Sequence, residues 1–319
     1  MKWRGDVLTA RELAIARSVI YASLFDYPLT LEQLHHALIE SDQTTQEILA
    51  VYDGSERLQT IVDYRDGFFF PAGRDDLIAE RRRRETRSRE FLAHHARVLR
   101  LLCALPFTRL VALSGSVAHL NLEANGDLDL FIVTKGRRVW TVTVAAILLT
   151  RLLGERRVIC ANFVVADSHL RLGQQDLFTA NQVIHLKPLV GESVLGEFFA
   201  ANGFVARFYP NAGVPRRDGV PFPAKSRLRT GMKKALELAL ALPSPIVEAG
   251  CRRVYAWHLH RRAASWRSPD QVRLQSDYLK LHTQSHRHTV LDRFDAAVDE
   301  AVARAALASA PRAAAGGRR

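Results

Sequence analysis

Four residues near the middle of the chain combine a flexible bend with two carboxylates. Gly115 and Ser116 directly follow a short apolar run, and Asp127 and Asp129 open the next apolar run along the chain. One pair offers hydrogen-bond donors and the other offers anionic oxygens. Residues of these types at this spacing could bind a phosphate group and a divalent cation together.

The bend is suited to phosphate. Gly115 allows the backbone to approach a ligand closely, and N–H groups at the start of a helix favour phosphate oxygens. The hydroxyl of Ser116 adds a donor at the same place. We therefore expect Gly115 and Ser116 to bind a nucleotide.

The two aspartates are suited to a metal. Asp127 and Asp129 stand two positions apart on a predicted strand, which puts both carboxylates on one face, while Leu128 and Leu130 face the core. Neighbouring carboxylates repel each other, and a hard cation relieves that repulsion. The pair predicts a magnesium site.

Together these residues resemble the signature of the DNA polymerase β-type nucleotidyltransferase superfamily: an apolar strand, Gly-Ser, a short gap and then Asp-apolar-Asp-apolar. The strand and helix pattern extends the resemblance over residues 105–170. The resemblance implies that Asp127 and Asp129 hold Mg²⁺ and that Gly115 and Ser116 hold the β and γ phosphates of a nucleoside triphosphate. A nucleotidyl group would then pass to an unidentified acceptor while pyrophosphate leaves.

The chain departs from the family pattern at a third position. Family members usually carry another carboxylate on the following central strand, where this chain has Asn162. Asn162 can form hydrogen bonds but cannot accept a proton, and Asp167 could substitute only if the chain curls back. A protein that keeps the fold without catalysis is therefore the main alternative to an enzyme.

The elements that must position these residues form an α+β pattern. Strands are expected at 109–113, 128–133 and 157–165, with a helix at 140–153 between the last two. They predict a small mixed β-sheet, the nucleotidyltransferase core, over residues 106–175. From 176 to 304 the pattern predicts a helical C-terminal region, and 305–319 reads as a disordered tail.

The N-terminal part resembles a winged helix-turn-helix. Helices are expected at 10–25, 31–40 and from residue 48, the second opened by a capping box of Thr30 and Gln33. Apolar runs on both sides of Asp66-Gly67 predict a hairpin. This winged-helix-like domain spans residues 1–75, and a helix over 76–105 links it to the core.

Nucleic acid is a less favoured partner of that domain than protein. The third helical stretch, 41–58, carries four acidic residues and Arg57 as its one cation. A helix that enters the major groove needs lysine and arginine. A winged-helix transcription regulator therefore remains only an alternative, as does a glycosyltransferase that uses Asp127 and Asp129 as its metal motif.

Composition sets the outer limits. The chain has 319 residues, 48% of them hydrophobic, and a net charge of +12, which favours anionic partners. Its three cysteines are far apart and predict neither a zinc knuckle nor a disulfide scaffold. No secretory signal and no apolar run long enough for a membrane span are visible, so we expect a cytoplasmic protein.

Overall fold

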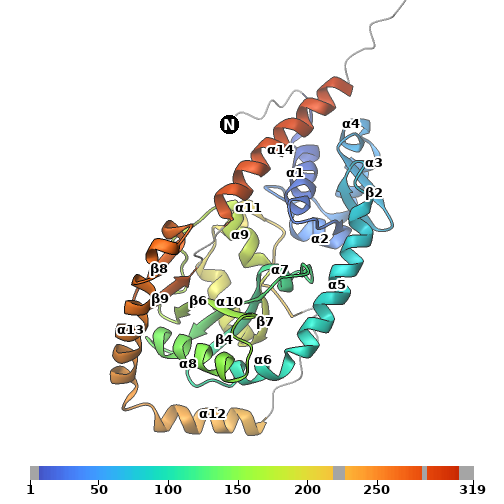
Figure 1. Cartoon of the computed structure of the whole chain (residues 1–319). Helices are drawn as coiled ribbons and strands as arrows, with labels where there is room; N and C mark the ends of the chain where they lie inside the picture. The colour runs from blue at the N-terminus through green and yellow to red at the C-terminus, as the bar shows by residue number, and fades with distance from the viewer. Residues whose placement is uncertain (1–6, 218–226, 282–285, 309–319) are drawn as a thin grey trace, which may run out of the picture. The chain divides into compact units, whose positions relative to one another are not determined.

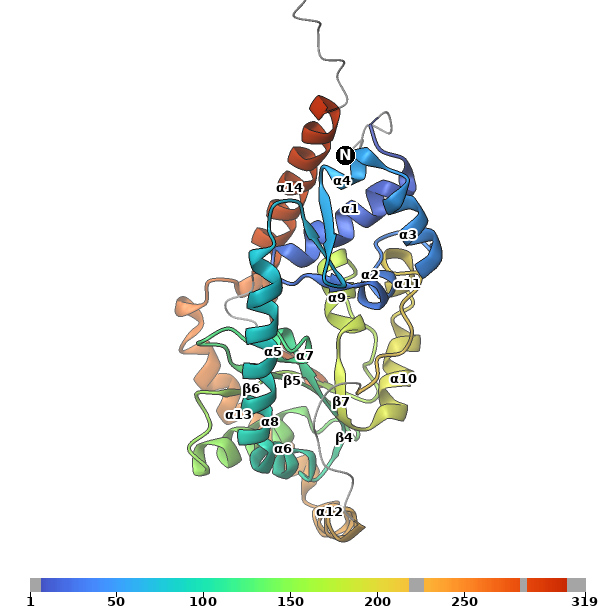
Figure 2. The same ribbon diagram turned by 90° about the vertical axis from the view of Figure 1, so that its right-hand side faces the viewer.

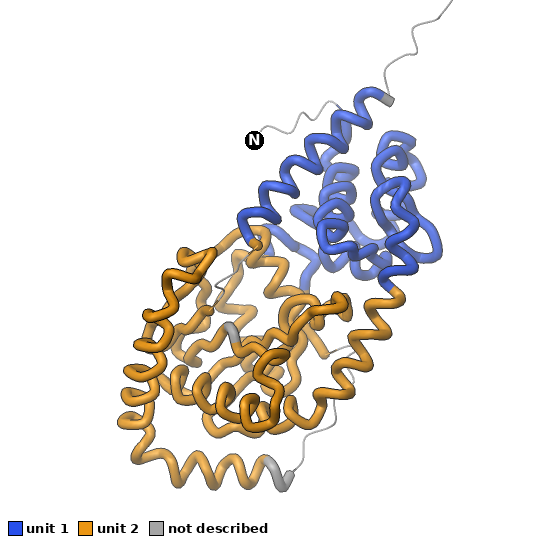
Figure 3. The backbone as a smooth tube through the Cα atoms, viewed as in Figure 1, with its two compact units in different colours: residues 1–81, 206–212, 287–319 blue, residues 82–205, 213–286 orange. Residues whose placement is uncertain are grey.

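The computed structural model describes residues 7–217, 227–281 and 286–308. Helices alternate with the strands of a mixed sheet (Figure 1), which confirms the α+β class. Backbone contacts divide the chain into two units (Figure 3): unit 1 is 1–81, 206–212 and 287–319, and unit 2 is 82–205 and 213–286. In the described part of the chain, no helix is both long and apolar enough to cross a bilayer.

Unit 1 begins with short helices, and capping residues in the sequence mark where most of them begin. These helices are α1 (Ala10–Ser23), α2 (Leu31–His36), α3 (Thr45–Asp53) and α4 (Glu56–Gln59). A threonine precedes each of the first three helices and forms a capping box with a glutamate or glutamine three positions later. Each box satisfies backbone N–H groups that a helix start leaves unpaired. The predicted box of Thr30 and Gln33 is confirmed.

A small antiparallel sheet follows the helices. It consists of β1 (Leu29–Thr30), β2 (Val62–Arg65) and β3 (Phe68–Pro71) in the order β1-β3-β2. The turn between β2 and β3 has positive φ at Asp66 (52°) and Gly67 (81°). Two such residues form the turn that matches the twist of paired strands. The predicted hairpin is confirmed.

The last described helix, α14 (Arg287–Ala308), belongs to unit 1. Its buried face repeats every three or four residues, and the ring of Phe294 lies 5.2 Å from that of Tyr21 on α1. The prediction placed this segment with the 176–304 region and began a tail at residue 305. That boundary is wrong, because the helix continues through residue 308; the rest of the predicted tail, 309–319, lies outside the described residues.

Unit 2 is built on a six-stranded sheet. The strands are β4 (Thr108–Ser114), β5 (Leu128–Thr134), β6 (Ile159–Ala166), β7 (Lys187–Val190), β8 (Val272–Leu274) and β9 (Tyr278–Leu281). Their order is β7-β4-β5-β6-β9-β8, and β5 and β6 form the parallel pair of this otherwise antiparallel sheet.

Helices cover both faces of this sheet. One face is covered by the end of α5 (Asp76–His94), α6 (Ala96–Cys103) and α8 (Val139–Leu152). These helices share a core with Leu128, Leu130 and Ile132 of β5. A further helix, α13 (Ser244–His260), packs against α8. On the other face α9 (Leu177–Ile184) lines a pocket, and α10 (Glu192–Ala201) lies beside β7 and β4 (Figure 2). Two further helices of unit 2 are α7 (Gly115–Ala118) and α12 (Arg227–Ala239), while α11 (Val205–Phe208) belongs to unit 1 from residue 206 onward.

The prediction of a helical region from 176 to 304 is wrong in one respect, because β7, β8 and β9 lie within it. These strands have three or four residues, so alternation of apolar and polar residues cannot distinguish them from a turn of helix. In addition, β7 contains a proline, which argues against a strand in the sequence. The linking helix expected over 76–105 is interrupted at His95.

Candidate functional site

The sheet register brings the glycine bend to the second aspartate. Ser114, the last residue of β4, stands opposite Asp129 of β5. Gly115 follows with φ of 65°, and a Cβ added there would lie 2.8 Å from Oδ2 of Asp129. Glycine is required at this position both by its backbone angle and by the carboxylate against it.

The two aspartates share a neighbour in Cys160. Asp129 is half-buried and stands opposite Cys160 of β6, while Asp127 is exposed just before β5. Burial, together with the charges of Asp127 and Asp129, raises the pKa of the Cys160 thiol to about 11. Arg156 opposes this effect from 4.0 Å. Both carboxylates therefore place negative potential at one point of the sheet.

Ser116 lies directly after the bend, half-buried in the single turn of α7. Its carbonyl oxygen accepts hydrogen bonds from the backbone N–H groups of His119 (3.2 Å) and Asn121 (2.9 Å). The ring of His119 stacks on that of His185 at 4.0 Å. The bend thus leads into a short, internally bonded loop.

The strand that should carry a third carboxylate contains an irregularity. Asp129 pairs with Cys160, but Phe131 pairs with Phe163, so one extra residue is inserted in β6 between these points. Asn162 falls in this insertion, and its side chain lies outside the described atoms. The residue opposite Asp129 is Cys160, which sequence reasoning missed because the register of two distant strands decides it.

Asp167 lies at the opposite end of the strands from Asp129. β5 and β6 run parallel from the aspartate pair toward Thr134 and Ala166, and Asp167 follows β6. Its carboxylate pairs with Arg109 at 3.2 Å and accepts a hydrogen bond from the backbone of Gly136 at 2.9 Å. The chain does not curl back, so Asp167 does not join the aspartate pair.

A pocket opens beside Asp129. It contains about 620 Å³ of empty space, part of which is open to solvent. Ser114, Gly115 and Asp129 form one wall, and α9 forms another. The aromatic residues that line it are Phe131, Phe163, Phe198 and Tyr278. An apolar pocket that borders a charged group is the usual form of a small-molecule site.

The pocket also holds a cation that the sequence did not single out. Lys280 of β9 lies in the wall, where its Nζ donates to Oε1 of Gln174 (2.7 Å) and Oε1 of Gln271 (3.3 Å). Its position follows from the pairing of Lys280 with Phe163 across β6 and β9. The residues of β9, Tyr278 to Leu281, are too few for a local pattern to predict this strand.

Neither a protein-family model, nor a curated protein, nor a solved structure matches the chain.

Proposed function

We propose that the chain is a magnesium-dependent nucleotidyltransferase that moves a nucleotidyl group from a nucleoside triphosphate to an unidentified acceptor. In this proposal β4, β5 and β6 with their helices are the nucleotidyltransferase core. The order of parts supports it: a strand ends in a Gly-Ser bend, the neighbouring strand opens with two aspartates, and a helix leads to a parallel third strand.

The observation that carries the proposal is the contact between the Asp129 carboxylate and Gly115, with Asp127 acting on the same thiol as Asp129. Carboxylate oxygens are the ligands that magnesium prefers. Burial is the main cause of the raised Cys160 pKa, and the charges of Asp127 and Asp129 add to it, which is compatible with a cation site beside the two carboxylates.

Each residue then has a definite task. Asp127 and Asp129 would hold magnesium, which when bound neutralises charge on the transferring phosphate. Gly115 lets the triphosphate approach the backbone, and the Ser116 hydroxyl donates to a phosphate oxygen. The aromatic pocket beside Asp129 would receive the nucleoside or the acceptor, with Lys280 as a cationic contact.

One observation favours the alternative, a nucleotide-binding protein without catalysis. Cys160, not a carboxylate, stands opposite Asp129, and its raised pKa keeps the thiol protonated at neutral pH. A protonated thiol cannot take the proton of an acceptor hydroxyl. Binding and transfer must therefore be measured separately.

Unit 1 fits a winged-helix-like interaction module. The helices α1 to α4 and a three-stranded sheet that contains a hairpin support that reading. α3 contains Glu47 and Asp53 and no lysine or arginine, which disfavours the major groove of DNA. We propose that this module contacts protein.

The test compares the wild type with an Asp127→Asn, Asp129→Asn double variant. Binding of each labelled triphosphate is measured with and without Mg²⁺, and transfer to protein or an added acceptor is followed separately. A matched variant, Asp292→Asn with Asp299→Asn, removes the same charge from exposed positions on α14.

We expect the site variant to lose magnesium-dependent binding and to lower any transfer at least about a hundredfold, the size of a strong electrostatic contribution. The α14 variant should behave as the wild type. Binding without transfer to any acceptor tested favours the non-catalytic alternative. Magnesium-dependent binding that survives in the site variant excludes the assignment of Asp127 and Asp129.

A further inference from the structure

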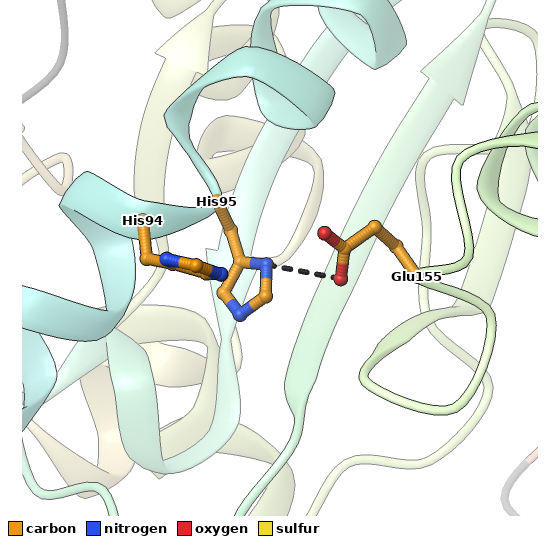
Figure 4. A group of neighbouring side chains, drawn as sticks. All are labelled: His94, His95 and Glu155. Carbon is orange, nitrogen blue, oxygen red and sulfur yellow. Dashed lines mark ion pairs between the residues drawn. The ribbon is translucent and has the colours of Figure 1, made fainter.

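Three metal-ligating side chains meet in unit 2 away from the aspartate pair. His94 ends α5, His95 precedes α6, and Glu155 lies in the turn between α8 and β6 (Figure 4). One ligand atom from each lies within 4.8 Å of the other two. We call these residues the histidine–glutamate cluster.

The interruption between α5 and α6 creates this arrangement. His95 has φ of −89° and ψ of 6°, outside the values of a regular helix. Consecutive side chains on a regular helix diverge, whereas the rings of His94 and His95 lie 4.8 Å apart and nearly perpendicular, at 85°. The break therefore turns two neighbouring imidazoles toward one point.

The buried member of the cluster has an unsatisfied atom. His95 is 6% exposed, and its Nδ1 is buried without a hydrogen bond. Oε2 of Glu155 lies 3.1 Å from that nitrogen and forms an ion pair with it when the imidazole is protonated. A buried imidazole nitrogen that faces a carboxylate at ion-pair distance, with a second imidazole beside it, is a reason to look for a cation among the three groups.

We propose that His94, His95 and Glu155 bind a transition-metal ion of the zinc class. Two imidazole nitrogens and one carboxylate oxygen are a common zinc set, and a water molecule would complete a tetrahedron. Bonds of roughly 2.0–2.2 Å imply ligand atoms roughly 3.5 Å apart. The exposed side chain of His94 can close the remaining gap by rotating about its own bonds.

This site is chemically distinct from the aspartate pair and does not depend on the proposed function. Magnesium prefers oxygen ligands in an octahedral set, whereas imidazole nitrogen selects zinc and its neighbours. Glu155 accepts backbone hydrogen bonds from Val158 (3.1 Å) and Ile159 (3.0 Å) at the start of β6. A metal at Glu155 would therefore anchor α5 and α6 to the strand that carries Cys160.

The test is a titration of the full chain, freed of metal by a chelator, with Zn²⁺ and with Co²⁺. We expect one equivalent to bind, the visible absorption of four-coordinate Co²⁺ to appear, and Zn²⁺ to raise the midpoint of thermal unfolding. A large excess of Mg²⁺ should not displace the bound ion.

Variants assign the ligands. Two separate variants, His94→Ala and Glu155→Gln, each remove one ligand, and His94 is exposed. Each variant should weaken Zn²⁺ binding at least about a hundredfold. His260→Ala, an exposed histidine on α13, is the matched control and should bind as the wild type. The Asp127→Asn, Asp129→Asn variant should also bind normally. The proposal is overturned by absence of one-to-one binding, by binding that survives in both cluster variants, or by loss of binding in the aspartate variant.

Discussion

Gly115 occupies the left-handed region of backbone space, with the Asp129 carboxylate directly against it. We expect Gly115→Ala to lower stability by about 1–2 kcal/mol through its backbone angle. The new methyl group must also displace the carboxylate, so magnesium-dependent triphosphate binding should fall at least about tenfold, or 1.4 kcal/mol. Denaturant unfolding and nucleotide titration measure the two effects.

Gly154→Ala is the control for that substitution. Gly154 has φ of 76°, and an added Cβ would have no neighbour within 4 Å. Both variants should lose similar stability, and only Gly115→Ala should lose binding. Equal binding by the two variants would show that the position of the Asp129 carboxylate has no part in nucleotide recognition.

Cys160 reports the charge of the aspartate pair. Burial first, and then Asp127 and Asp129, raise its pKa to about 11. Since alkylation requires the thiolate, Cys160 should react slowly at pH 7–8 and faster as pH rises. Removing both carboxylates in the Asp127→Asn, Asp129→Asn variant should lower the pKa and shift the rate profile toward lower pH.

The measurement is the iodoacetamide reaction rate at Cys160, resolved by mass spectrometry over a pH series. Cys251, which is not among the neighbours of the pair, provides the internal standard. An unchanged profile at Cys160 would mean that the carboxylates do not act on this thiol.

For single residues, the sequence predicted which residues lie close together along the chain, but it did not predict which residues face each other across paired strands. Gly115-Ser116 and the spacing of Asp127 and Asp129 could be read directly, because a turn and a strand period decide their geometry. Cys160 and Lys280 could not, since their places depend on which strands pair and on the extra residue in β6. The same irregularity left Asn162 without a position that spacing could predict.

Among the elements, α8 depends on a cap supplied by another helix. The side chain of its N-cap residue, Arg138, forms no capping hydrogen bond with the first turn of the helix. Glu248 of α13 instead accepts hydrogen bonds from the backbone N–H groups of Trp140 (2.9 Å) and Thr141 (2.8 Å). A carboxylate at a helix start also interacts favourably with the helix dipole.

We therefore expect Glu248→Ala to lower the free energy of unfolding by about 1–2 kcal/mol. Glu248→Gln, which keeps one acceptor oxygen, should lose less. Glu300→Ala removes an exposed glutamate that pairs with Arg304 on α14, and it should cost under about 0.5 kcal/mol. Urea unfolding measures the free energy of unfolding of the three variants. Equal losses of stability in all three would show that Glu248 does not cap α8.

Elements with strong local signals were predicted well, and elements that depend on partners were not. The hairpin around Asp66-Gly67 and the capping box at Thr30 follow from turn and cap chemistry. The strands β8 and β9 are short pieces that become a sheet only by pairing beside β6. Local pattern cannot supply that partner.

For the whole molecule, the net charge of +12 predicts weak binding to any polyanion. Duplex DNA should bind at low salt with no sequence preference, and affinity should fall steeply as salt rises. The aspartate double variant should bind duplex at least as well as the wild type, because it has two fewer negative charges. Fluorescence anisotropy over a salt series checks this; a sequence-selective, salt-resistant complex would instead favour a DNA-binding role for unit 1.

Charge and length could be read from the sequence, but the division of the chain could not. The apolar residues of α14 recur at helical spacing, which shows that one face of the helix is buried. This spacing does not identify the element that covers the face. Its partner is α1, at the other end of the described chain. Consecutive segments were therefore a poor guide to the two units.

The pairing of α1 with α14 has a consequence for biosynthesis. A ribosome releases α1 first and α14 only after every strand of unit 2 has emerged. Until then the apolar side of α1 that receives Phe294 has no cover. Nascent chains halted before residue 287 should therefore recruit holdase chaperones, even when the six-stranded sheet is already complete.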